Sequence, residues 1–149
     1  MSIALSHIQS SDLSRNPVKV FAAAEVGPVL LTRRDGENFV IMTQREAETR
    51  QKLHQFVAAF YNVATDDRGG SLVERMVRQF PWMGALSADG RKACTAQLSQ
   101  AASAAFATGQ SHMLEEEYDS WFETAEAMAA GLKPARFDPS ETPIRAECP

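Results

Sequence analysis

Two spacings of apolar residues follow one another along this chain. In the first third, short apolar runs predict strands, first from Ile3 to Ile8 and then on both sides of a polar turn between Val29 and Met42. Beyond Thr43, apolar residues recur every three or four positions, which is typical of amphipathic helices. The pattern therefore predicts a small sheet followed by helices only.

The polar turn predicts a β-hairpin. Asp35-Gly36 lies at its centre, and this dipeptide favours the positive φ angles of a two-residue turn. With that turn, Arg34 is expected to face Glu37, and Leu31 to face Val40.

A helix is expected between the first strand and the hairpin. Its candidate N-caps are Ser10, Ser11 and Ser14. One stripe of its wheel carries Leu13, Pro17, Val20, Phe21 and Ala24. Because proline fits only in a first helical turn, the helix either begins near Ser14 or bends at Pro17, and Gly27-Pro28 ends it.

The helical region begins with the capping-box pattern Thr43-Gln-Arg-Glu46, which predicts a helix to about Ala64. The polar, glycine-containing segment Asp66–Gly70 is the best linker candidate. Three more helices are predicted: Ser71 to Gln79, a helix capped by Ser87 that runs to Thr108, and a last one from Ser111 to Gly131.

These elements predict an α+β fold with three parts. Residues 1–64 form a three-stranded sheet with two helices, and residues 71–132 form a helical region. Residues 133–149 are proline-rich and are expected to be a loosely ordered tail.

Composition excludes some classes of protein and predicts where in the cell the chain is located. No apolar run approaches the roughly 20 residues of a membrane span, and the N-terminus lacks the basic and apolar regions of a signal peptide. Cys94 and Cys148 are far apart and match no metal spacing, so a reducing, cytoplasmic setting is expected.

Charge is distributed unevenly. The net charge of −4 combines seven Lys and Arg against six Asp and Glu in residues 1–60 with eight against thirteen in residues 61–149. The two halves are therefore expected to meet different partners. An acidic total does not exclude DNA binding, because the local patch sets the affinity.

Four basic residues of the N-terminal half are the candidate site. Arg15 and Lys19 lie one helical turn apart, and Arg33 and Arg34 lie at the tip of the hairpin. The alternative is that Arg15 and Lys19 simply form a solvent-exposed helix face without a binding role. The added hairpin arginines favour a surface that binds phosphate groups.

We find no pattern for enzymatic chemistry. His7, His54 and His112 are widely separated, and no glycine-rich phosphate loop, nucleophile elbow or paired-cysteine motif is present in the sequence. A non-enzymatic protein without a metal or cofactor is expected.

Three stretches together resemble a known family. Asp12 to Phe21 (DLSRNPVKVF), Gly27 to Glu37 (GPVLLTRRDGE) and Val40 to Glu46 (VIMTQRE) resemble the Phd/YefM, or prevent-host-death, family of type II antitoxins. The resemblance covers roughly residues 3–60. Residues from Phe80 to Gly131 are similar to the C-terminal part of longer members.

The resemblance implies a homodimer that binds operator DNA and represses its own operon, while a C-terminal segment neutralises a cognate toxin. The family's DNA-contacting positions match Arg15 and Arg33, and Lys19 and Arg34 are added on spacing alone. The chain departs from the best-known members in length, because its C-terminal helices look able to fold without a toxin.

Two alternatives remain open. A solitary transcriptional regulator would share the DNA-binding half but have no toxin, so residues 71–132 would only cover the core. A protein-interaction adaptor would keep the sheet and lack DNA binding, as the acidic total allows.

Overall fold

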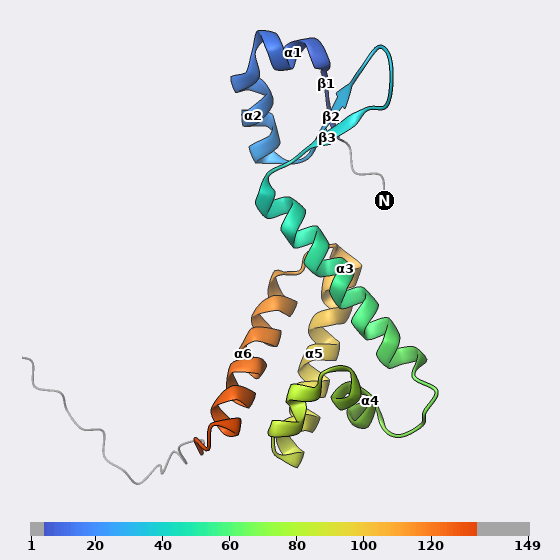
Figure 1. The fold of residues 1–149 in the computed structure, drawn as a ribbon, viewed down its shortest axis with the longest axis vertical. Helices are drawn as coiled ribbons and strands as arrows, with labels where there is room; N and C mark the ends of the chain where they lie inside the picture. Colours follow the sequence, from blue (N-terminus) through green and yellow to red (C-terminus); the bar gives the residue numbers. More distant parts are fainter. Residues whose placement is uncertain (1–4, 134–149) are drawn as a thin grey trace, which may run out of the picture. The chain divides into compact units, whose positions relative to one another are not determined.

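The computed structural model describes residues 5–133, and within them the fold is α+β (Figure 1). The elements in chain order are β1 (Ser6–Gln9), α1 (Ser10–Arg15), α2 (Pro17–Val26), β2 (Val29–Thr32), β3 (Phe39–Ile41), α3 (Gln44–Thr65), α4 (Leu72–Gln79), the 3-10 helix η1 (Pro81–Ala85), α5 (Ala88–Thr108) and α6 (His112–Ala129). The tail expected at 133–149 lies, apart from its first residue, outside the described residues.

The described residues form two compact units. One contains the chain up to Tyr61 together with Ala102–Met113, and the other contains Asn62–Ala101 and the residues from Leu114 onward. The sheet and its two helices belong to the first unit, while α4 and η1 belong to the second.

The sheet has the order β1-β2-β3, with β1 parallel and β3 antiparallel to β2. Among the described residues the first strand runs from Ser6 to Gln9, so it ends one residue later than predicted. Ile3 lies outside the described residues. The parallel register sets His7 beside Leu30 and Gln9 beside Thr32.

The predicted hairpin register is wrong by one residue. Leu31 pairs with Phe39 instead of Val40, and Val40 pairs with Leu30, so Asp35-Gly36 is not a two-residue turn. The cause is a side chain: the amide of Arg33 donates to Oδ1 of Asn38 at 3.1 Å, which closes a wider loop.

The first predicted helix is two helices. Asn16 has non-helical angles between α1 and α2, and Pro17 occupies the first position of α2, where its missing N–H costs nothing. The predicted serine N-caps are wrong, because Asn16 Oδ1 accepts from the Lys19 amide and Gln9 precedes α1. Ser10, Ser11 and Ser14 lie inside α1.

A small core holds the N-terminal elements together. It consists of Val20 and Ala24 from α2 and Val29 and Leu31 from β2, all at most 7% exposed. Val18, Phe21, Phe39 and Val40 of the same elements are 47% to 75% exposed, so this core is minimal for a stable sheet.

Capping side chains mark helix starts in the rest of the chain, at the predicted Thr43 and Ser87 and also at Ser71. The Glu46 amide donates to Thr43 Oγ1, the Gly90 amide to Ser87 Oγ, and Ser71 and Glu74 form a reciprocal capping box. Gly109 and Gly131, with positive φ angles, follow α5 and α6.

The second unit has a larger core of its own. Its buried apolar residues are Val63, Met76, Phe80, Met83, Leu86, Cys94, Leu98, Leu114 and Ala125. Beside it, Trp82 makes edge-to-face contacts with Tyr118 and Phe122, and its indole N–H donates to the Tyr118 hydroxyl at 3.1 Å.

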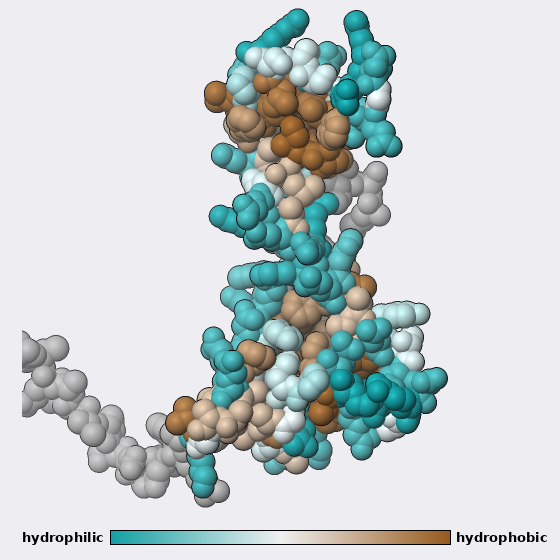
Figure 2. Space-filling model, in the orientation of Figure 1, coloured by the Kyte–Doolittle hydropathy of each residue, from teal (hydrophilic) through white to brown (hydrophobic). Residues whose placement is uncertain are grey.

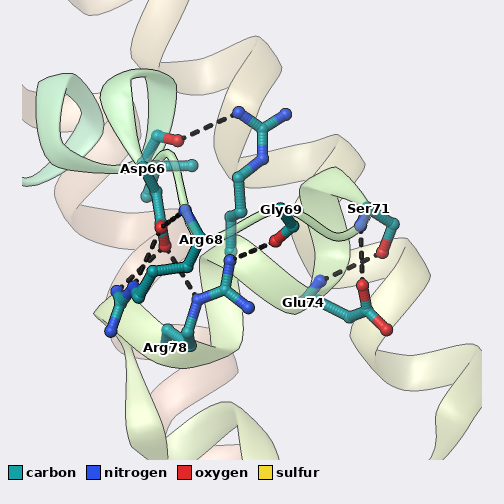
Figure 3. A network of polar contacts seen from close by, with 8 residues as sticks. Asp66, Arg68, Gly69, Ser71, Glu74 and Arg78 are labelled. Atoms are coloured by element: carbon teal, nitrogen blue, oxygen red, sulfur yellow. Dashed lines mark hydrogen bonds and ion pairs between the residues drawn. The ribbon is translucent and has the colours of Figure 1, made fainter.

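An ion-pair corner joins α3 to α4 where the sequence predicted a linker (Figure 3). Asp66, whose side chain is only 5% exposed, accepts hydrogen bonds from the guanidinium groups of Arg68 and Arg78. Arg78 Nη2 also donates to the Gly69 carbonyl at 2.6 Å. These arginines, Arg68 before Arg78, hold the pKa of Asp66 well below its usual range.

Among residues 5–133, no helix combines the length and the apolar composition that crossing a bilayer requires.

The ion pairs of Asp66 predict that the stability of the fold depends on pH. Because the pKa of Asp66 is lowered in the folded state, its stabilisation is complete above the ordinary aspartate value of 3.8 and is lost as the pH falls below it. We expect Asp66→Asn to be less stable than wild type at pH 7, with the difference shrinking towards pH 3. Urea unfolding followed by tryptophan fluorescence measures the free energy of unfolding, since Trp82 and Trp121 belong to the same compact unit as Asp66.

Asp67, the exposed neighbour of Asp66 in the sequence, offers a matched control. Asp67→Asn removes the same charge one residue away and should keep the acid-dependent loss of stability. An Asp66→Asn variant that lost stability with acid as steeply as wild type would show that the corner does not couple protonation to folding.

Candidate nucleic-acid interface

Parallel pairing places two distant segments at one edge of the sheet. Gln9 ends β1 and lies beside Thr32, which ends β2. The segments after these two strands, α1 in one case and the hairpin loop in the other, therefore start at the same edge. The Thr32 hydroxyl donates across the pair to the Ile8 carbonyl at 3.3 Å.

A hollow of about 610 Å³ opens at this edge, and we call it the arginine hollow. Its lining residues are Gln9, Ser10, Ser11, Arg15, Thr32, Arg33 and Arg34. Three of the four predicted basic residues thus share one hollow. Lys19 does not line it.

The break between α1 and α2 separates Arg15 from Lys19. Arg15 is the last residue of α1, where the Asn16 amide donates to the Asp12 carbonyl at 2.8 Å, and Lys19 lies in the first turn of α2. The one-turn spacing that grouped them in the sequence applies to a continuous helix, and the chain does not form one here.

Arg33 is positioned by its own loop. Its guanidinium carbon lies 5.5 Å from the centre of the Phe39 ring, at a cation–π distance. Its backbone amide is held by Asn38. Gly36 has a φ of +107°, a backbone conformation that favours glycine. An added Cβ there would lie 3.6 Å from Arg33 Nη1, which is an ordinary contact, so the reason for glycine is its backbone conformation and not lack of space.

The arginine hollow is positive despite the acidic chain. Among the residues that the structure describes, no aspartate or glutamate lines it, and none of Arg15, Arg33 and Arg34 makes an ion pair with a carboxylate. Asp12, the nearest acid along α1, accepts from the Gln9 amide at 3.2 Å. The hollow therefore offers three uncompensated guanidinium groups to an anion.

Sequence reasoning missed the polar part of the lining. The pattern indicates Ser10 and Ser11 as caps and does not single out Gln9 and Thr32. The signal that links them is non-local: only the parallel pairing of β1 with β2 brings the serines beside the hairpin arginines.

Within the described range, no three His, Cys, Asp or Glu side chains gather closely enough to hold a metal ion. Burial, and secondarily the charge of Glu117, raises the pKa of the Cys94 thiol to about 12, so this thiol is protonated at neutral pH.

A second hollow, of about 550 Å³, lies in the helical unit. Trp121, Met128 and Leu86 give it apolar walls, and Lys133 is the one charged residue in its described lining. The Trp121 indole N–H is occupied, because it donates to Gln97 and Glu117 at 2.9 and 3.0 Å.

Comparisons of this chain with models of protein families, with curated proteins and with solved structures find no match.

Proposed function

We propose that the N-terminal unit binds double-stranded DNA through the arginine hollow, and that the chain is the antitoxin of a type II toxin–antitoxin pair. One observation carries the DNA part of the proposal: Arg15, Arg33 and Arg34 line one hollow that no acidic side chain among residues 5–133 lines. The antitoxin part rests on the sequence resemblance.

Phosphate is the ligand that best suits this hollow. Guanidinium groups bind phosphate oxygens through paired, charge-assisted hydrogen bonds, and the hydroxyls of Ser10 and Ser11 supply neutral donors. The net charge of −4 acts in the opposite direction, because it repels DNA at longer range. Binding is therefore local and sensitive to salt.

A homodimer is part of the proposal because the N-terminal elements leave apolar side chains open. Val18 and Phe21 of α2 are 75% and 55% exposed, and Phe39 and Val40 of β3 are about half exposed. Figure 2 shows hydrophobic side chains gathered over these elements. A second copy would cover them and would present a second hollow to a palindromic operator.

The helical region is the proposed toxin-binding part. The solitary regulator is the second candidate, and the separate core around Met76, Met83 and Leu98 favours it, since a helical unit with its own core needs no toxin to fold. Co-expression with the product of the adjacent reading frame distinguishes the two, because an antitoxin should co-purify with it and restore growth.

The DNA proposal predicts a salt signature. In a dimer, Arg15→Ala or Arg33→Ala removes two phosphate contacts, so the slope of log K against log salt should fall in magnitude by about 1.8. Affinity at low salt should fall as well. Gel-shift titration of an operator fragment at two salt concentrations measures both quantities.

The matched control is Arg45→Ala, which removes an exposed arginine of α3 that does not line the hollow. Its affinity and slope should match wild type. Equal binding by wild type and an Arg15→Ala/Arg33→Ala double variant would remove the DNA proposal.

The dimer proposal predicts that a charge on α2 dissociates the protein. Phe21→Asp would place a carboxylate in the buried interface, where desolvation is costly, so the mass by light scattering should fall from two chains to one. Leu72→Asp, at a 43% exposed position of α4, is the control and should leave the mass unchanged. A wild-type protein that is monomeric at high micromolar concentration would contradict the proposal.

A further inference from the structure

We propose that the arginine hollow binds a pyrophosphoryl group, as carried by a nucleoside diphosphate or by free pyrophosphate, and that this ligand displaces DNA. The displacement rests on the proposed function, whereas the binding of the anion does not.

The charge density of the hollow favours a diphosphate. The three arginines bring three positive charges to one hollow, and none of its described lining residues is acidic. A phosphodiester of DNA carries a single negative charge, and successive phosphates of a strand are spread along the helix axis by about 3.4 Å per nucleotide. A pyrophosphoryl group concentrates two or three negative charges on the oxygens of two linked phosphates. It therefore neutralises the hollow more completely than one backbone phosphate does.

The available donors favour the same ligand. The side chains of Ser10 and Ser11 make no hydrogen bond to any other described residue, so both hydroxyls can donate to a ligand. The hydroxyl of Thr32 is different, because it already donates to the Ile8 carbonyl. Two hydroxyls and three guanidinium groups suit the many acceptor oxygens of a diphosphate.

The size of the hollow also fits. A volume of about 610 Å³ lies in the range of about 300–1,000 Å³ that small-molecule sites occupy, and it exceeds the need of a lone phosphate. The position of Arg33 adds preorganisation, since Phe39 and the Asn38 contact hold the residue before any ligand arrives.

The test is isothermal titration of the full chain, in metal-free buffer at fixed ionic strength, with sodium pyrophosphate, ADP, AMP and inorganic phosphate. We expect pyrophosphate and ADP to bind at least about tenfold more tightly than phosphate and AMP. Tighter binding of ADP than of pyrophosphate would identify a nucleotide as the source, and the reverse would identify the free anion. Pyrophosphate that bound no more tightly than phosphate would overturn the proposal.

Variants locate the site. Arg15→Ala and Arg34→Ala should each weaken pyrophosphate binding by at least about tenfold, while Arg45→Ala should not change it. Arg33→Ala would also remove the contact with Phe39, so Arg33→Lys is the test variant at this position. The positive charge remains, the paired hydrogen bonds of the guanidinium group are lost, and pyrophosphate binding should weaken. Circular dichroism checks that each variant is folded. Equal weakening by Arg45→Ala would show general charge attraction and overturn the assignment.

A competition arm separates this proposal from the DNA proposal. A fluorescent operator duplex bound to the protein should be released by pyrophosphate at concentrations where sodium sulfate of equal ionic strength has no effect. Pyrophosphate binding without any DNA binding would refute the proposed function and leave the anion site standing. DNA binding that pyrophosphate did not disturb would refute the displacement.

Discussion

The parallel pairing of β1 with β2 is the constraint on which the site depends. It joins residues 23 positions apart in the pair Gln9 and Thr32, and so brings the start of α1 beside the hairpin loop. Without that register, Arg15 and Arg33 would belong to separate surfaces. The pairing is short, and the buried side chains of Val29 and Leu31 under α2 hold β2 in place. The positive hollow is thus a product of the sheet as much as of the arginines.

The arginines of this chain lie in two kinds of environment. In the second unit, Arg68 and Arg78 converge on the nearly buried Asp66, so their charges are neutralised and serve to fix the corner between α3 and α4. In the first unit, Arg15, Arg33 and Arg34 have no carboxylate partner in the described chain. This difference makes the hollow a candidate for an external anion, and it explains how an acidic protein can carry a local positive site.

Local signals predicted the order of the elements well. Thr43, Ser71 and Ser87 precede helices that begin where expected, because capping depends on residues three positions apart. The errors came from side chains that bond to the backbone in ways periodicity does not encode. Asn38 widened the hairpin loop, and Asn16 divided the first helix.

The candidate site was predictable in part. Arg33 and Arg34 were identifiable as hairpin-tip cations, but their grouping with Arg15 and not with Lys19 required the fold. Ser10 and Ser11 could not be assigned to the site, because parallel pairing is a long-range choice that a strand pattern does not determine. The same holds for Asp66, whose partner Arg78 lies twelve residues away.

An NMR titration of the isotopically labelled chain with a short operator duplex, observed at the arginine Nε–Hε and serine amide signals, tests the proposed DNA-binding role of the hollow most directly. We predict that Arg15, Arg33 and Arg34 shift together with Ser10 and Ser11, at one common duplex concentration. Shifts confined to α4, α5 and α6, with these five residues unchanged, would contradict that role.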